Sequence, residues 1–276
     1  MHNTRPTIAE KRHEFRKMHE AGCFAIPNPW DAGSALYLQS LGFPALATTS
    51  SGFAWSQGHC DGGMSRDRVL LHLADMVAAT DVPVNADFES GFARDSHEVA
   101  ESVALAVQTG VAGLSIEDST GVPGNPLFDV DAAVARIRAA RRAIDAGGGE
   151  TLLVGRAECF LVGHPDLQET IARLKAYANA GADCLYAPGI RTREEIATVV
   201  AAVAPRPVNL LVGGMADLTM RDIAELGVRR VSVGGALARS AWGGFMRAAR
   251  LIADEGRFDG FSDAASGQDL NALFRR

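Results

Sequence analysis

Short apolar runs alternate with amphipathic stretches along most of this chain. The apolar runs are nearly continuous, which is typical of strands buried on both faces of a parallel sheet. Strands are predicted near residues 24–27, 45–49, 83–87, 112–117, 151–156, 183–187, 207–212 and 229–233. Helical patterns lie between and after them, near 31–41, 65–80, 95–109, 130–146, 165–180, 192–204, 219–226 and 236–255. The first twenty or so residues predict an additional helix.

Glycines and polar caps mark the ends of these helices. A glycine stands between a predicted helix and the next strand at Gly42, Gly110, Gly181 and Gly227, where the left-handed conformation would end the helix. Ser96 is a candidate cap, and Thr192 with Glu195 has capping-box spacing. No G-x-G-x-x-G follows the first strand, which disfavours a dinucleotide-binding sheet. Eight strand–helix units therefore predict an α/β fold of the (β/α)8 TIM-barrel type with an extra N-terminal helix.

Length and charge narrow the class of protein. Because α/β barrels often use 200–250 residues, the 276 residues predict one barrel domain, 1–276. The formal charge of −6 argues against a nucleic-acid partner or an anionic membrane surface. The polar N-terminus has no signal-peptide pattern, and no apolar run is long enough to span a membrane. Four cysteines without a C-x-x-C pair fit a reducing, cytoplasmic location.

Polar residues concentrate where the predicted strands end. Five acids follow successive strands, namely Asp61, Asp87, Glu89, Glu117 and, as a further candidate, Glu158. In a barrel these ends converge on one mouth, where several carboxylates would raise each other's pKa. A divalent cation relieves that repulsion, and oxygen ligands alone favour Mg2+ or Mn2+. Arg156 adds a guanidinium fork suited to a carboxylate or phosphate, so the sequence predicts an anionic, oxygen-rich substrate.

Structural interpretations stand beside these functional ones. A single strand-end acid is often a helix cap or an ion-pair partner, and Asp118 is interpreted in this structural way; Arg156 alone fits an ordinary ion pair with Glu158 or Glu117. Trp30 is a candidate substrate contact, with packing at the barrel end as the alternative. The pairs Gly213–Gly214 and Gly234–Gly235 resemble the barrel phosphate site and favour a sugar-phosphate aldolase or isomerase. Against that, Lys175 is the one lysine beyond the N-terminal helix, and it lies within a predicted helix.

Five segments, in this order, carry a family resemblance: NPWDAGSALYLQSLGFPALATTSSGFA, VPVNADFESGF, GVAGLSIED, VGRAECFLVG and AYANAGADCLYAPG. Together they resemble the isocitrate lyase/phosphoenolpyruvate mutase superfamily, from about residue 24 to residue 235. The resemblance implies a Mg2+-dependent barrel that acts on small α-oxo carboxylates and cleaves or forms a C–C or P–C bond. It also implies a homo-oligomer, a dimer or a tetramer, in which the eighth helix is exchanged between subunits.

The resemblance assigns roles to particular residues. Ser51, Gly52 and Phe53 match the segment that holds the oxo-carboxylate, and Arg156 matches the carboxylate-binding arginine. Asp87 matches the direct metal ligand. Water-mediated metal ligands are matched by Asp61, Glu89 and Glu117. Asn209 matches a strand-7 asparagine of the lyases, and Asn125 matches a mutase loop asparagine.

The loop at 119–126 departs from the family pattern. It has none of the lysine, cysteine or histidine that lyases carry in a K-K-C-G-H segment, and it lacks the mutase lysine. Decarboxylation needs no separate acid when the bond breaks, so it tolerates this loss best. The sequence therefore favours C–C cleavage of an oxaloacetate-like or 2-oxoglutarate-like acid through a metal-stabilised enolate. The alternatives are phosphonopyruvate hydrolase or mutase chemistry and a non-catalytic oxo-acid-binding barrel.

Overall fold

The computed structural model describes residues 5–275, and a parallel eight-stranded sheet forms its centre. The strands are β1 (Phe24–Ala25), β2 (Leu46–Ala47), β3 (Val84–Asp87), β4 (Gly113–Glu117), β5 (Leu152–Arg156), β6 (Cys184–Tyr186), β7 (Val208–Leu211) and β8 (Arg230–Ser232). Their order is β1-β8-β7-β6-β5-β4-β3-β2, and every pairing is parallel. The amide of Ala47 donates to the carbonyl of Pro27 at 3.1 Å, which joins the two edge strands. The predicted TIM-barrel-like fold is confirmed.

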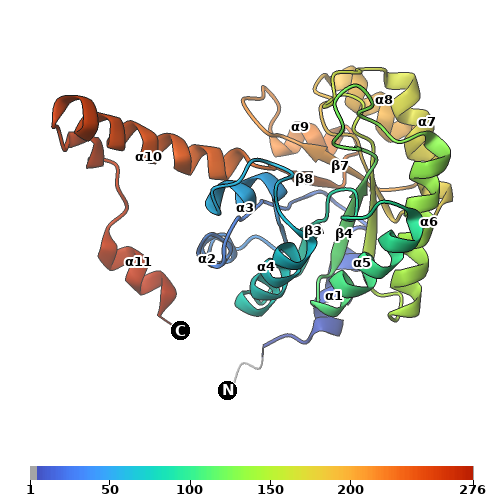
Figure 1. Ribbon diagram of the computed structural model, residues 1–276, viewed down its shortest axis with the longest axis horizontal. Helices are drawn as coiled ribbons and strands as arrows, with labels where there is room; N and C mark the ends of the chain where they lie inside the picture. Colours follow the sequence, from blue (N-terminus) through green and yellow to red (C-terminus); the bar gives the residue numbers. More distant parts are fainter. Residues whose placement is uncertain (1–4, 276) are drawn as a thin grey trace.

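Helices surround this sheet (Figure 1). They are α1 (Ile8–Met18), α2 (Ala32–Ser40), α3 (Ser50–Ser56), α4 (Arg66–Ala79), α5 (Ser96–Gln108), α6 (Val130–Ala146), α7 (Leu167–Asn179), α8 (Arg193–Val203), α9 (Met220–Glu225), α10 (Ala236–Glu255), the 3-10 turn η1 (Asp259–Phe261) and α11 (Gly267–Phe274). The eight helices predicted between residues 31 and 255 lie within two residues of these bounds, whereas the additional N-terminal helix, predicted over about the first twenty residues, begins at Ile8. The pattern did not predict α3, with seven residues, or α11, with eight, because neither takes part in the repeated alternation of strand and helix.

Helix ends follow the expected chemistry with one correction. Gly42, Gly110, Gly181 and Gly227 all have positive φ, between 84° and 108°. The capping box of α8 forms as predicted. The cap of α5 is Asp95 rather than Ser96, because the Asp95 carboxylate accepts the amides of residues 97 and 98 at 2.9 and 3.0 Å.

The amino end of the barrel is closed by α1. Phe15 of this helix is fully buried in a cluster of inward-facing residues from alternate strand positions, among them Ile26, Leu152 and Val154. A second, larger apolar cluster fills the space between the sheet and the outer helices. Since the amino end is plugged, the barrel interior opens only toward the carboxyl ends of the strands.

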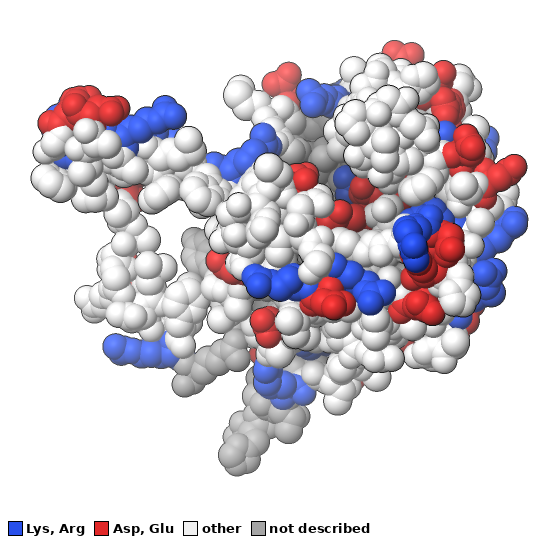
Figure 2. All heavy atoms as spheres, viewed as in Figure 1, with Lys and Arg blue, Asp and Glu red and all other residues white. Residues whose placement is uncertain are grey.

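The last helices leave the barrel as an arm. α10 projects outward, and η1 and α11 bring the chain back so that α11 contacts α2 (Figure 1). Along α10 only Ala238 is buried, whereas Trp242, Phe245 and Met246 are 40–62% exposed. Figure 2 shows long stretches of uncharged surface on this arm. Within residues 5–275, no helix is long and apolar enough to cross a membrane.

Candidate active site

Three adjacent strands deliver charged side chains to one point at the carboxyl end of the barrel. Arg156, at the end of β5, has Glu117 of β4 as its register neighbour. Its Nη1 lies 3.2 Å from Asp87 Oδ1 and 3.1 Å from Glu117 Oε2, and its Nε donates to Glu158. The ring of Tyr186 on β6 lies beneath the guanidinium, 5.1 Å from its carbon to the ring centroid. The predicted convergence of Asp87, Glu117 and Arg156 is therefore observed.

The turn before α3 fixes the second oxygen of Asp87. Ser50 donates to Asp87 Oδ2 twice, from its amide at 2.9 Å and from its hydroxyl at 2.8 Å. The same hydroxyl lies 3.4 Å from Asp61 Oδ1, which brings the loop acid to the cluster. Thr49 caps α3, so the helix begins where Ser50 meets β3. Ser50 was not among the predicted site residues, although its position directly after a predicted strand end was a usable signal.

Burial and like charges perturb the acids of this cluster. Burial, reinforced by Asp87 and Asp61, raises the pKa of Glu89 to about 7. Burial also raises the pKa values of Asp61, Glu158 and, most strongly, Glu117, even though Arg156 opposes each shift. For Arg156, burial favours the neutral form, but Glu117 and Glu158 raise its pKa well above the usual range. One guanidinium thus faces five carboxylates, and the cluster has an excess of negative charge.

This excess is suited to a hard divalent cation. The donors are carboxylate and hydroxyl oxygens, which Mg2+ and Mn2+ prefer. Asp87 is the best-placed direct ligand, because Ser50 holds its orientation in the way that hydrogen-bonded neighbours hold metal ligands. The positions of Asp61, Glu89 and Glu117 around it are compatible with binding through water. The residues present therefore fit a magnesium or manganese ion.

Glu89 follows β3 in an unusual backbone conformation. Its φ is +46°, and Phe92 three residues later has φ of +51°. Non-glycine residues rarely adopt this left-handed region. The turn is supported by Phe88, which is fully buried and packs edge-on against Phe92 with 5.1 Å between ring centroids. The strained turn directs the chain so that Glu89 stays near Asp87.

Two cavities meet at this cluster. The larger has a volume of about 980 Å3 and lies among the loops that follow β6, β7 and β8. The narrower has a volume of about 170 Å3 and extends from Asp87 and Arg156 into the barrel, where Asn209 and Arg230 line it. Both have Ser51 and Asp61 in their walls, so the charged cluster is reachable from the larger one.

The three residues predicted to hold the oxo-carboxylate, Ser51, Gly52 and Phe53, do not all reach a cavity. Ser51 lines both cavities, whereas Gly52 and Phe53 are buried and their amides donate to Thr49. Phe53 stacks on the imidazole of His72, with 3.9 Å between ring centroids.

Three more predicted contacts complete this comparison. Trp30 packs against Gly52 and lines neither cavity. Asn125 lies in the exposed loop that Ser119 and Leu127 close by an antiparallel bridge, and it lines neither cavity. Asn209 is buried inside the barrel and lines the narrow cavity.

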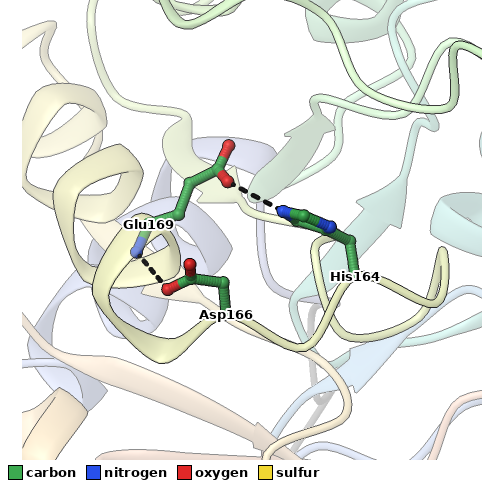
Figure 3. Close-up of side chains that lie close together, drawn as sticks. All are labelled: His164, Asp166 and Glu169. Carbon is green, nitrogen blue, oxygen red and sulfur yellow. Dashed lines mark hydrogen bonds and ion pairs between the residues drawn. The ribbon is translucent and has the colours of Figure 1, made fainter.

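A separate group of possible metal ligands lies before α7. Ligand atoms of His164, Asp166 and Glu169 are within 4.8 Å of one another (Figure 3). Asp166 caps α7 by accepting the amide of Glu169 at 2.9 Å, and Glu169 pairs with His164 at 3.2 Å and with Arg173 at 2.8 Å. Helix capping and ion pairing account for this exposed group.

Comparison with known proteins identifies the family. A family model described as phosphoenolpyruvate phosphomutase matches residues 15–253. A crystal structure from Burkholderia cenocepacia, described as a lyase/mutase, is 48% identical, covers 97% of each chain and has a TM-score of 0.94. The 2-methylisocitrate lyase of Halalkalibacterium halodurans is 27% identical over 95% of this chain and 88% of its own. The oxaloacetate decarboxylase of Paraburkholderia xenovorans is 33% identical over 59% of this chain and 54% of its own. This chain, as its resemblance implied, belongs to the phosphoenolpyruvate phosphomutase family.

Proposed function

We propose that this protein is a Mg2+- or Mn2+-dependent carbon–carbon lyase or decarboxylase that acts on a small α-oxo dicarboxylate. The observation that carries the proposal is the cluster of carboxylates around Arg156, where Glu158 is buried, Asp87, Glu89 and Glu117 are partly buried and Asp61 is exposed, at the mouth of a cavity walled by Ser51. The relatives named as 2-methylisocitrate lyase and oxaloacetate decarboxylase support C–C cleavage. Oxaloacetate, whose second carboxylate is β to the oxo group and can therefore leave to give an enolate, is the candidate substrate for decarboxylation, and 2-oxoglutarate-like acids are candidate ligands.

The side chains have distinct tasks in such a reaction. Arg156 and Ser51 bind the oxo-carboxylate, because both line the cavity and present N–H and O–H donors. Ser50 keeps Asp87 oriented, and Glu117 keeps Arg156 in place. The bound cation supplies Lewis acidity, which stabilises negative charge developing on the oxo oxygen. When the C–C bond one carbon away from the oxo group breaks, the electron pair is left as an enolate of the oxo acid.

The loop between β4 and α6 favours decarboxylation among the possible cleavages. Its exposed segment 121–125 contains no lysine, cysteine or histidine that could protonate a leaving group. Loss of carbon dioxide needs no proton donor in the bond-breaking step, and the resulting enolate is protonated afterwards. A retro-aldol cleavage, by contrast, needs a base to remove the hydroxyl proton of its substrate.

The test is a substrate panel with and without Mg2+. Oxaloacetate, other oxo-diacids, 2-methylisocitrate and phosphonopyruvate are incubated with the protein, and pyruvate, carbon dioxide, glyoxylate and phosphate are measured. We expect Mg2+-dependent release of pyruvate and carbon dioxide from an oxo-diacid. Asp87→Ala is expected to abolish turnover and to weaken Mg2+ binding measured by calorimetry, whereas the exposed control Asp75→Ala retains both. Full turnover by Asp87→Ala refutes the metal assignment.

Phosphorus–carbon chemistry is the second candidate. The family model that matches is that of a phosphomutase, and a phosphonate would use the same oxo-acid contacts. Phosphate release from phosphonopyruvate in the panel would identify a hydrolase, and conversion to phosphoenolpyruvate would identify a mutase. Binding of oxo acids without any turnover would identify a non-catalytic barrel.

We also propose that α10 packs on a second copy of this chain. Its apolar face at Trp242, Phe245 and Met246 is exposed, although the helix is twenty residues, or about 30 Å, long. Exposed apolar patches of this kind mark interfaces. The root of α10 stays with its own barrel, where Ala238 packs beside Gly52. This arrangement suits the helix exchange that the family resemblance implies, in a dimer or a tetramer.

A further inference from the structure

A second arginine lies deep inside the barrel, below the charged cluster. Arg230 is the first residue of β8, and its side chain is 3% exposed. It pairs in register with Asn209 of β7, and its guanidinium reaches across the interior to Asn85 of β3. Asn85 precedes Asp87 by two residues on the same strand, which places them about 7 Å apart along it.

The hydrogen-bond partners of Arg230 are all neutral. Its Nε donates to Asn209 Oδ1 at 2.8 Å, and its Nη1 donates to Asn85 Oδ1 at 3.2 Å. Nη1 also lies 3.4 Å from Nε2 of His19. Burial and the nearby Arg230 lower the pKa of His19 to about 3, so the imidazole is neutral. Nδ1 of His19 lies 2.7 Å from the Phe15 carbonyl, which leaves Nε2 as an acceptor.

No carboxylate in the described part of the chain offsets this buried charge. No aspartate or glutamate among residues 5–275 forms an ion pair with Arg230, whereas Arg156 pairs with three acids and Arg173 with two. No acceptor for Nη2 of Arg230 is present in the described part of the chain. Arginine stays protonated in proteins, and an uncompensated charge in a protein interior is costly. The guanidinium therefore retains both a free donor and a full positive charge.

The narrow cavity connects this charge to the candidate active site. Asp87, Arg156, Asn85, Asn209 and Arg230 all line its volume of about 170 Å3. The two arginines that line this cavity differ in their net charge environment. Three acids at the mouth offset the charge of Arg156, whereas no acid among residues 5–275 pairs with Arg230. A small anion that enters from the mouth thus meets, at the inner end, a guanidinium that is hydrogen-bonded to neutral side chains and has no acidic partner among residues 5–275.

Gly113 makes room for this arrangement. A Cβ atom on this residue would lie 2.7 Å from Asn85 Oδ1 and 2.7 Å from the ring of Phe15. The glycine therefore allows Asn85 to point into the barrel beside Arg230 while Phe15 closes the end below. An interior composed this way holds polar groups where barrels usually hold branched apolar residues.

We propose that Arg230, oriented by Asn85 and Asn209, binds the distal carboxylate of an α-oxo dicarboxylate. The oxo-carboxylate end of this ligand lies at Ser51 and Arg156, so the inference rests on the proposed function and adds a subsite to it. The carboxylate held there is one that cleavage leaves intact, because an ion pair with Arg230 stabilises a carboxylate against loss as carbon dioxide. The subsite selects diacids over monoacids, since only a second carboxylate meets the charge of Arg230.

The first test compares matched ligands on the unaltered protein. Binding of 2-oxoglutarate and 2-oxovalerate is measured by calorimetry in Mg2+; the two have the same carbon chain and differ in a carboxylate in place of a methyl group. A hydrogen-bonded charge pair corresponds to about tenfold or more in affinity. We expect 2-oxoglutarate to bind at least tenfold more tightly. Equal binding of the two, or binding of neither, overturns the subsite.

Variants separate recognition from a structural role. Arg230→Met is expected to remove the preference for the diacid while 2-oxovalerate binding stays within about twofold, and Arg230→Lys is expected to retain part of it. Arg229→Met is the matched control, because Arg229 lies next to Arg230 but binds the Gly22 carbonyl outside the cavity. If Arg230→Met weakens both ligands equally, or leaves the preference intact, the proposal is wrong.

The outcome is independent of turnover. If no acid of the panel is cleaved but the diacid preference depends on Arg230, the reaction proposal fails and the subsite stands. If oxo-diacids are cleaved and the paired ligands bind alike, the subsite fails and the reaction stands.

Discussion

Asp118→Asn tests how much one buried carboxylate stabilises the ends of β4 and β5, where Glu117 and Glu158 lie. Asp118 is 2% exposed and accepts from three donors. Its Oδ1 accepts the Glu158 amide at 2.8 Å, and its Oδ2 accepts from Arg173 Nη1 at 3.1 Å and from the Tyr177 hydroxyl at 2.5 Å. Both oxygens of the Asp118 carboxylate accept hydrogen bonds. In asparagine one of these oxygens is replaced by an NH2 group, which cannot accept and would lie against a donor.

The size of the effect follows from this geometry. The variant leaves the buried Arg173 without the negative charge of Asp118, and breaking a buried pair costs about 3–5 kcal/mol. Two hydrogen bonds to charged groups, at about 1.5–3 kcal/mol each, give a similar total of about 3–6 kcal/mol. For a domain of this size the melting temperature should fall by about 6–20 °C. Turnover should fall as well, since Glu158 and its partner Arg156 lose a fixed position.

Urea unfolding followed by circular dichroism measures the change. The control is Asp75→Asn on the exposed side of α4, which should alter the free energy of unfolding by less than about 0.5 kcal/mol. Tyr177→Phe, which removes one donor and no charge, should lie between the two. A loss below about 1 kcal/mol for Asp118→Asn would show that the network does not stabilise the barrel as argued.

Three further outcomes are expected. Ser50→Ala removes the hydroxyl donor to Asp87 and keeps the amide donor, so Mg2+ affinity should fall about 10–100-fold in a calorimetric titration; unchanged affinity contradicts the supporting role of Ser50. His19 has a folded-state pKa of about 3 against an unfolded value of 6.5, so its contribution to stability is present above pH 6.5 and is lost as the pH falls toward 3. Between pH 7 and pH 4.5, the free energy of unfolding should therefore fall by about 2–3 kcal/mol less in His19→Gln than in the unaltered protein. The exposed control His13→Gln should show the full fall, and equal acid sensitivity in both variants refutes this. Phe245→Glu on α10 should reduce the mass measured by light scattering toward that of one chain, and an unaltered mass would place this residue outside the interface.

Helices that belong to the repeated strand–helix pattern were predictable from the sequence, including the six-residue α9, whereas α3 and α11, which stand outside that pattern, were not. Helices such as α5 and α6 have two or more turns with one apolar face, so their ends were found within two residues. α3 has seven residues and depends on Thr49 as its cap and on Asp87 as the partner of Ser50. That second support comes from another strand, and local sequence does not contain it.

The candidate site shows the same division. Asp87, Glu117 and Arg156 were identifiable because parallel strands bring their carboxyl ends to one mouth. Arg230 stands beside Arg229 in the sequence, and only the barrel register decides which of the two points inward. The run RRVSV shows that a charged residue lies in an apolar strand, but not which of the two arginine side chains points into the barrel.

The turn after β3 connects the stability of this protein with its chemistry. Glu89 and Phe92 in left-handed conformation each cost about 1 kcal/mol or more relative to an ordinary backbone. Glycine at either position would relieve that cost. At position 89 it would remove a carboxylate from the cluster, and at position 92 it would remove the ring that packs on Phe88. At Phe92 the ring packing thus offsets the backbone cost within the fold itself, whereas at Glu89 the compensating gain is a carboxylate for the charged cluster, so stability alone disfavours the left-handed Glu89.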